Sequence, residues 1–207
     1  MNDWDEGNIK FLVAVMGAII LYILLYIIFV PLARADNQIS IDQIGSYNTV
    51  IVTQDGTTQS ATVSLGKTSS VDNTYVNITQ QGTGNKTAGV EIPSGYNNSV
   101  VMFQDGAGNH TAAIQNLNGA ANNISFSQTG SGNHSMTVTG GQGTTNSGNT
   151  IDATQSGGAG ADKSFQLNLN GTSGATVNVL QTNPTQSNSG SMTIQCVTCG
   201  TYNYTRQ

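Results

Sequence analysis

The chain has 207 residues, of which only 8% are charged, and its formal net charge is −5. Soluble globular domains carry roughly 25% charged residues, so this composition is unusual. The 6 Lys and Arg residues are scattered along the chain, which excludes the clustered positive surface that nucleic-acid binding requires.

The rest of the composition is dominated by small and polar residues, including 25 glycines. Gly-, Ser- and Gln-rich segments often stay disordered, so disorder is one interpretation. The periodicity described below favours another, a repetitive β structure whose buried amides and hydroxyls bond to one another.

Residues 11–30 form a continuous apolar stretch that spans about 30 Å as a helix, the thickness of a hydrocarbon core. The stretch is longer than a usual signal-peptide core and follows an acidic start, which favours a retained membrane anchor. The tripeptide ARA at 33–35 forms an A-x-A site, which favours cleavage before Asp36. We assign residues 1–35 to an anchor or signal segment and expect one membrane-length α-helix there.

The motif Gln-x-Gly-x-x-Asn, or a degraded form of it, recurs along the remaining chain. Its successive glutamines are separated by 11, 26, 24, 24, 27 and 26 residues. A fixed period in this range is typical of solenoids and repeat arrays. The glutamines are Gln43, Gln54, Gln80, Gln104, Gln128, Gln155 and Gln181.

Each unit combines two stretches of alternating residues around a glycine. Period-two alternation predicts a β-strand, and the glycine permits a tight turn. The expected turn glycines are Gly45, Gly56, Gly82, Gly106, Gly130 and Gly157. In the unit 98–115, the residues expected on the inner face are Asn98, Val100, Met102 and Gln104 before the turn, and Asn109, Thr111, Ala113 and Gln115 after it.

Stacked units place equivalent amides about 4.8 Å apart, close enough for hydrogen-bonded ladders. One unit cannot bury its own inner face, whereas a stack can. The sequence therefore predicts an all-β, strand-turn-strand β-solenoid over residues 36–195, with about six rungs and a half rung at Gln43. The expected ladder residues are Gln54, Gln80, Gln104, Gln115, Gln128, Gln155 and Gln181, with Asn48, Asn85, Asn98, Asn109 and Asn133.

The pattern Q-x-G-x-x-N-x-(small)-x-x-x-Q resembles the curlin repeat of curli, the bacterial extracellular amyloid fibres. Residues 98–115 match best and residues 122–139 next, and the resemblance covers roughly residues 38–195. It implies a secreted β-solenoid that assembles into fibres or surface structures. The units here are longer than usual, and the second-strand glutamine survives only at Gln115 and Gln166. These departures, together with the membrane-length stretch, fit a capped or tethered solenoid equally well.

Two further features recur on neighbouring units. His110 and His134 both follow the turn Asn, and we expect them one above the other and facing solvent. A shared metal or a pH-sensitive pair is the alternative. Apolar residues at the expected outward positions form a stripe, which is either ordinary surface or a contact face for a second copy or another partner. These residues are Val101, Phe103, Ala112, Ile114 and Phe126.

Cys196 and Cys199 are the only cysteines and lie in a tail assigned to residues 196–207. No His or further Cys is near enough to complete a zinc site, and a thioredoxin-like role would need a βαβ context. We expect a local disulfide outside the cytoplasm, with intermolecular bonding as the alternative.

The sequence has no catalytic constellation, because its carboxylates are isolated and no phosphate-cradling loop leads into a helix. A solenoid enzyme acting on polysaccharide would need clustered carboxylates. We expect no enzyme activity, no metal and no cofactor. Two functions remain: a self-assembling structural or adhesive surface protein, or a membrane-anchored capped solenoid that binds a virion component, a surface protein or a glycan. The expected location is a membrane anchored through residues 11–30, with an extracytoplasmic domain, or secretion to the cell surface.

Overall fold

The structure is a computed structural model, and the described residues are 15–16, 36–66, 70–93, 97–115, 122–140, 148–169, 176–194 and 201–207. The chain divides into two compact units, Met1–Arg34 and Ala35–Gln207. In the first unit only Val15 and Met16 are described, and both are helical. Among the described residues, no helix is both long and apolar enough to cross a membrane. The rest of the expected membrane-length helix and the expected disulfide lie outside the described residues.

The described part of the second unit contains strands and no helix. Its strands are β1 (Gln38–Gln43), β2 (Thr49–Gly56), β3 (Gln59–Leu65), β4 (Tyr75–Gly82), β5 (Lys86–Glu91), β6 (Ser99–Asp105), β7 (His110–Ala113), β8 (Asn123–Gly130), β9 (His134–Val138), β10 (Thr150–Gly157), β11 (Lys163–Leu169), β12 (Thr176–Gln181), β13 (Asn188–Ile194) and β14 (Tyr202–Arg206).

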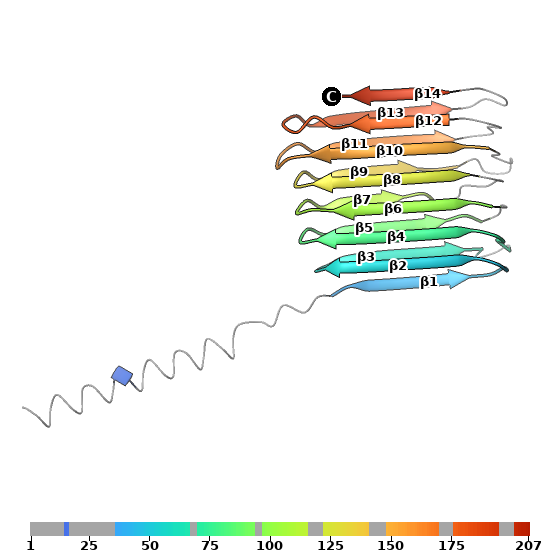
Figure 1. Ribbon diagram of the computed structural model, residues 1–207, viewed down its shortest axis with the longest axis horizontal. Helices are drawn as coiled ribbons and strands as arrows, with labels where there is room; N and C mark the ends of the chain where they lie inside the picture. Colours follow the sequence, from blue (N-terminus) through green and yellow to red (C-terminus); the bar gives the residue numbers. More distant parts are fainter. Residues whose placement is uncertain are drawn as a thin grey trace, which may run out of the picture. The chain divides into compact units, whose positions relative to one another are not determined.

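These strands form two seven-stranded sheets, and the chain alternates between them (Figure 1). The odd sheet has the order β1-β3-β5-β7-β9-β11-β13, and the even sheet has the order β14-β12-β10-β8-β6-β4-β2. Neighbouring strands within each sheet pair in parallel. The predicted all-β architecture, a β-solenoid of stacked strands, is confirmed.

The glutamine motif sets the register of this stack. Gln104 in β6 lies opposite Gln80 in β4 on one side and Gln128 in β8 on the other. Each of these partners is 24 residues away, which is one repeat unit. A slip by one residue would move every side chain to the opposite face of the sheet, so the repeat period and the register depend on each other.

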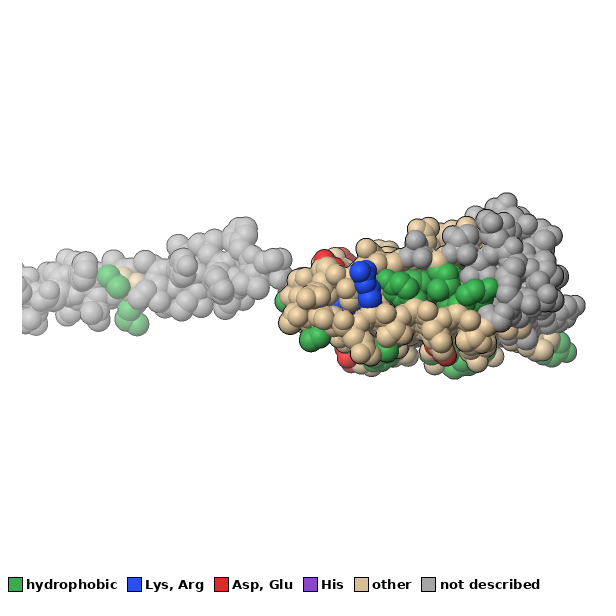
Figure 2. Space-filling view, turned by 90° about the horizontal axis from the view of Figure 1, so that it is seen from above, with side chains coloured by type: hydrophobic (Ala, Val, Ile, Leu, Met, Phe, Trp, Pro, Cys, Tyr) green, Lys and Arg blue, Asp and Glu red, His purple; other side chains and the backbone are tan. Residues whose placement is uncertain are grey.

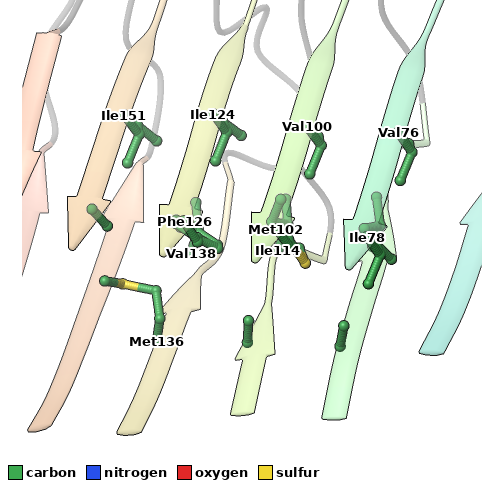
Figure 3. Packing of buried hydrophobic residues seen from close by; sticks show 14 of the residues in the cluster. Val76, Ile78, Val100, Met102, Ile114, Ile124, Phe126, Met136, Val138 and Ile151 are labelled. Carbon is green, nitrogen blue, oxygen red and sulfur yellow. The ribbon is translucent and has the colours of Figure 1, made fainter. Parts of the chain in front are cut away.

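The core consists of inward side chains from both sheets. In β6 the inward residues Val100, Met102 and Gln104 are at most 1% exposed, whereas the outward Val101 and Phe103 are half-buried. Figure 3 shows the inward residues of successive strands in columns, with Val76, Val100, Ile124 and Ile151 as one of them. The inward positions predicted for the first strand of the unit 98–115 are therefore confirmed.

The faces predicted for the second strand are wrong. His110, Ala112 and Ile114 point inward and are at most 1% exposed, while Thr111 is exposed and Ala113 is half-buried. The alternation restarts after the turn, because the number of turn residues determines which face the next strand buries. The proposed outward apolar stripe is consequently wrong at Ala112 and Ile114.

Phe126 was also expected to face outward, and this too is wrong. It lies on the inward face of β8, as Ile124 does, and is 2% exposed (Figure 3). The period-two pattern leading to Gln128 already places it inward, because the two residues are separated by two positions. Of the proposed stripe, only Val101 and Phe103 remain on the outer face.

The turn glycines adopt backbone conformations that other residues rarely enter. Gly106 has φ 110°. A Cβ on Gly106 would lie 2.2 Å from the carbonyl oxygen of Gly130, so the turns stack too closely for a side chain. Gly45, Gly56, Gly82 and Gly130 share the positive φ, but Gly157 does not. At Gly157 the restriction is one of space, because a Cβ would lie 2.5 Å from the oxygen of Ala161.

The described stack extends beyond residue 195, the boundary expected from the sequence. Strand β14, from the segment assigned as a tail, pairs in parallel with β12. Val177, Val179 and Gln181 of β12 lie opposite Tyr202, Tyr204 and Arg206. The last strand therefore continues the inner columns with larger side chains.

Candidate functional site: internal ladders and the ends of the stack

A ladder of glutamine side chains runs along the inside of the even sheet. Each glutamine donates a side-chain N–H to the amide oxygen of the next. The nitrogen–oxygen distances are 2.8 Å from Gln54 to Gln80, 2.9 Å from Gln80 to Gln104, 2.8 Å from Gln104 to Gln128, 2.8 Å from Gln128 to Gln155 and 3.0 Å from Gln155 to Gln181. All except the half-buried Gln54 are at most 1% exposed. The predicted ladder from Gln54 to Gln181 is present.

The second N–H of each ladder amide crosses to the opposite sheet. Gln104 donates it to the backbone carbonyl of Thr87 in β5, at 3.1 Å. The equivalent bonds run from Gln80 to Ser60, Gln128 to Thr111, Gln155 to Ser135 and Gln181 to Ser164. The ladder therefore links the two sheets as well as successive strands. Leaving such a buried amide unpaired costs about 1–3 kcal/mol.

Gln115 does not belong to this ladder, so that prediction is wrong. It lies after the end of β7, is exposed and has φ 61°. Gln166, the other glutamine at this position of the repeat, is also exposed. Both lie on the outer face, because the buried positions after the turn are even-numbered near Gln115, as at Ala112 and Ile114, and odd-numbered near Gln166, as at Phe165 and Leu167.

The asparagines before the first strands point inward. Asn98 is 1% exposed, and its side-chain oxygen accepts a hydrogen bond from the side-chain nitrogen of Asn122 at 3.1 Å. Asn48, at the end of the stack, donates to the carbonyl of Val71 and accepts from the backbone N–H of Thr74. Asn48 and Asn98 therefore both form hydrogen bonds to the next unit, as predicted for ladder residues.

The asparagines after the turns play a different part from the one expected. Asn85, Asn109 and Asn133 are exposed, not on the inner face with the glutamines. The side-chain oxygen of Asn109 accepts the backbone N–H of Asn85 at 3.0 Å, and that of Asn133 accepts the N–H of Asn109 at 3.1 Å. The oxygen of Asp162 continues the series from Asn133 at 2.7 Å. These side chains bond successive turns together on the outside of the stack.

The inner position next to these turn residues carries a buried column of polar and basic side chains. Strand pairing aligns consecutive members of the column. Its members, each at most 1% exposed, are Gln59, Lys86, His110, His134 and Lys163. The predicted stacking of the two histidines is confirmed, but the prediction that they face solvent is wrong, because both are buried. The signal in the sequence is a basic residue directly after the turn residue in four successive units, at Lys86, His110, His134 and Lys163.

The two lysines are held by backbone carbonyls of the turns. Nζ of Lys86 donates to the carbonyls of Gly84, Gly106 and Gly108 at 3.1, 2.9 and 2.7 Å. Three acceptors match the three N–H bonds of an ammonium group. Lys163 donates in the same way to the carbonyls of Ala161 and Gln186. Burial lowers the pKa of both lysines, and Asp105 and Asp162 respectively oppose that effect.

The imidazoles of His110 and His134 stack between these lysines. Their centroids are 4.9 Å apart and the ring planes differ by 22°. Burial, followed by the charge of Lys86 and by His134, lowers the pKa of His110 to about 4. Burial also lowers the pKa of His134, whose Nε2 lies 2.9 Å from the carbonyl oxygen of Thr129. Both rings are therefore neutral at pH 7.

The two ends of the stack differ in their inner columns. At the β1 end, Ile39 and Ile41 continue the columns of Ala61 and Val63, yet they are 52% and 50% exposed. At the β14 end, Tyr202 and Tyr204 pack partly buried against the core. Figure 2, which views the stack from the β14 end, shows a hydrophobic strip bordered by tan atoms, which belong to the backbone and to other side chains. Both ends therefore present cross-sections of the core.

A polar groove of about 390 Å³ lies on the odd sheet, where β7, β9, β11 and β13 begin. Most of its lining residues carry a hydroxyl or amide group, with Asp162 as an acidic residue and His134 and Lys163 as basic ones. Other residues along it are Asn109, Thr111, Asn133, Ser135, Ser164, Ser187, Asn188 and Ser189. Within the described residues, no group of three or more His, Cys, Asp and Glu is arranged to hold a metal ion.

Comparison of the chain with protein-family models, with curated proteins and with solved structures gave no match. The resemblance to curlin repeats therefore depends on the recurring sequence motif alone.

Proposed function

We propose that this chain is an extracytoplasmic structural protein of the curlin type that assembles by stacking solenoids end to end. The observation that carries this proposal is the glutamine ladder. Each side chain donates to the next one toward the C-terminal end of the stack, from Gln54 in β2 to Gln181 in β12. In this proposal the six strand pairs from β2–β3 to β12–β13 are the six full rungs, and β1 and β14 are half rungs. Adhesion within a surface matrix or biofilm follows as its role.

The two ends suit each other chemically. Continued parallel stacking would place β14 of one copy on β2 of the next, and β13 on β1. Tyr202 and Tyr204 would then cover Val50 and Val52, and Arg206 would reach the column position of Gln54. The guanidinium group only donates hydrogen bonds, and the amide oxygen of Gln54 receives none from the described residues. The exposed Ile39 and Ile41 would become buried under β13.

The proposal places residues 36–207 outside the cytoplasm. The apolar residues 11–30 are the support for this location, either as a retained anchor or as part of a removed signal segment. An oxidising compartment would also allow the local disulfide between Cys196 and Cys199. The proposal requires neither catalysis nor a cofactor.

A second function is supported by two separate observations. Tyr204 bends over the end of the odd sheet, where its hydroxyl donates to the carbonyl of Ser189, which is the behaviour of a cap. The polar groove beside Asp162 offers a surface for a glycan. A membrane-anchored, capped solenoid that binds a surface glycan or protein is therefore the alternative.

Assembly of purified residues 36–207, which include every described strand, separates the two functions. We expect material that sediments and gives meridional diffraction near 4.7 Å, the spacing of stacked strands. Replacing Ile39 and Ile41 by Asp should abolish sedimentation by placing charges in the end columns. Ile51→Asp is the matched control, because Ile51 is also exposed, at 43%, but points outward from β2. A β-rich species that stays monomeric without any substitution would refute assembly and support the capped alternative.

A further inference from the structure

Four consecutive odd strands bury a basic side chain at the same inner position. Lys86, His110, His134 and Lys163 follow one another in β5, β7, β9 and β11, and each is at most 1% exposed. Buried charges ordinarily require a partner of opposite charge. The lysines compensate with turn carbonyls, whereas the two histidines between them are accommodated as neutral rings.

Burial of the two rings disfavours an added proton. The Nε2 of His134 faces the carbonyl of Thr129, and since a carbonyl only accepts, this nitrogen carries the ring proton. Its Nδ1 is buried and makes no hydrogen bond, and neither ring nitrogen of His110 makes one. Backbone groups of Gly130 and Gly132 beside His110, and of Thr129 and Asn133 beside His134, favour the protonated rings, but burial outweighs them and lowers the pKa of both histidines. Protonation would therefore place a charge in a buried column that the neutral rings leave without one.

The charged groups around the pair add to this effect. Lys86 acts on His110 from β5, and Lys163 acts on His134 from β11, both in the direction that lowers the pKa. Asp162 acts on His134 in the opposite direction, but its effect is smaller than that of burial. Asp105 acts on Lys86. Two protonated rings would complete four adjacent positive charges along one column.

We propose that the stacked pair of His110 and His134 is an acid-sensitive joint of the solenoid, which holds β7 against β9 while both rings are neutral and opens when they are protonated. This inference rests on the fold and is independent of whether the protein assembles into fibres. It assigns the middle of the stack, not its ends, as the place where acid acts first.

The pH range in which the joint opens follows from the lowered pKa of His110. The folded pKa of His110 is about 4, below the ordinary value of 6.5, so the unfolded chain binds more protons between these values. The stability associated with the neutral ring is complete above pH 6.5 and is lost progressively as the pH falls toward 4. For His110 alone, this difference corresponds to about a 300-fold decrease in the equilibrium constant for the closed joint.

The first test is an NMR titration of the two imidazoles in the full chain, kept in a mild detergent. We expect both rings to remain neutral at pH 6 and to be protonated only together with loss of the native β7 and β9 signals. Titration of either ring near pH 6.5 with the strands intact would overturn the proposal.

The second test uses amide hydrogen exchange between pH 7 and 4, corrected for the intrinsic exchange rate. We expect protection in β7 and β9 to fall about 100-fold or more, ahead of the fall in β4 and β12. The double variant His110→Gln/His134→Gln should remove this early loss, because Gln59 already occupies the same column in the buried state. The same early loss in the double variant would refute the proposal.

A matched control changes the neighbouring outward positions of the same strands. Thr111→Gln/Ser135→Gln alters an exposed and a half-buried residue without touching the inner column. It should keep the acid response of the unmodified chain. If this control instead lost the acid response, the joint would lie outside the histidine pair. The NMR titration of the unmodified chain decides the question even if the double variant does not fold.

Discussion

The hydroxyl group of Tyr204 fills the space where a side chain on Gly190 would lie. A Cβ at Gly190 would be 2.4 Å from that hydroxyl oxygen. The ring of Tyr204 also lies 5.1 Å from that of Phe165, centroid to centroid. A glycine in β13 thus allows a tyrosine from the even sheet to cover the end of the odd sheet. The packing of β14 therefore depends on the absence of a side chain at Gly190 in β13 of the other sheet.

This relationship predicts a specific effect of Gly190→Ala. The new methyl group should displace Tyr204 and destabilise β14 by about 1–3 kcal/mol, the usual cost of overpacking. Hydrogen exchange of residues 202–206 measures this effect directly. Gly89→Ala is the control, because no atom lies within 4 Å of a Cβ at Gly89, and it should leave β14 unchanged. Equal protection of β14 in both variants would contradict the packing described here.

Shortening a ladder glutamine should destabilise the whole stack. Gln104→Ala removes the acceptor of Gln80 and the donor to Gln128, so two buried amides lose a partner. We expect the free energy of unfolding to fall by about 1–3 kcal/mol, measured by chemical denaturation. Gln166→Ala, at an exposed position of β11, should change it by less than about 0.5 kcal/mol. Similar values for the two variants would mean that the inner ladder contributes no net stability.

Replacing each buried lysine should act on its own histidine. Lys86→Met removes a positive charge that lowers the pKa of His110, so this pKa should rise from about 4 toward 6.5. Lys163→Met should raise the pKa of His134 for the same reason. NMR titration of both imidazoles in each variant checks this pairing. A change at neither histidine would show that the charges along the column are screened from each other.

The turn glycines should divide into two classes of sensitivity. Gly106→Ala combines a positive φ with a Cβ 2.2 Å from a backbone oxygen, so we expect a loss above about 2 kcal/mol. Gly160→Ala has φ 76° but nothing within 4 Å of its Cβ, so it should cost only about 1 kcal/mol. Thermal melting of the two variants measures the difference in stability loss. Because both glycines have a positive φ, this difference reports the contact between stacked turns and not the backbone strain. Equal losses would contradict the close approach of the turns.

Much of the first half of each unit could be predicted from the sequence. The period of the glutamines determines which residues are paired, because parallel strands one repeat apart lie side by side. Alternation within a strand then places Val100, Met102 and Gln104 on one face. Both periodicities are present in the order of the residues and do not depend on any contact between distant parts of the chain.

The second half of each unit was decided by tertiary structure. Alternation ends at a turn, and only the folded turn determines whether Asn109 or His110 faces inward. The burial of Lys86 also depends on carbonyls of the following unit, which become ligands only after the units stack. The pairing of β14 with β12 likewise depends on Gly190 leaving room for Tyr204. The sequence alone determined the repeat, the register and the first-strand core, whereas long-range packing decided the second-strand faces, the buried basic column and the end of the stack.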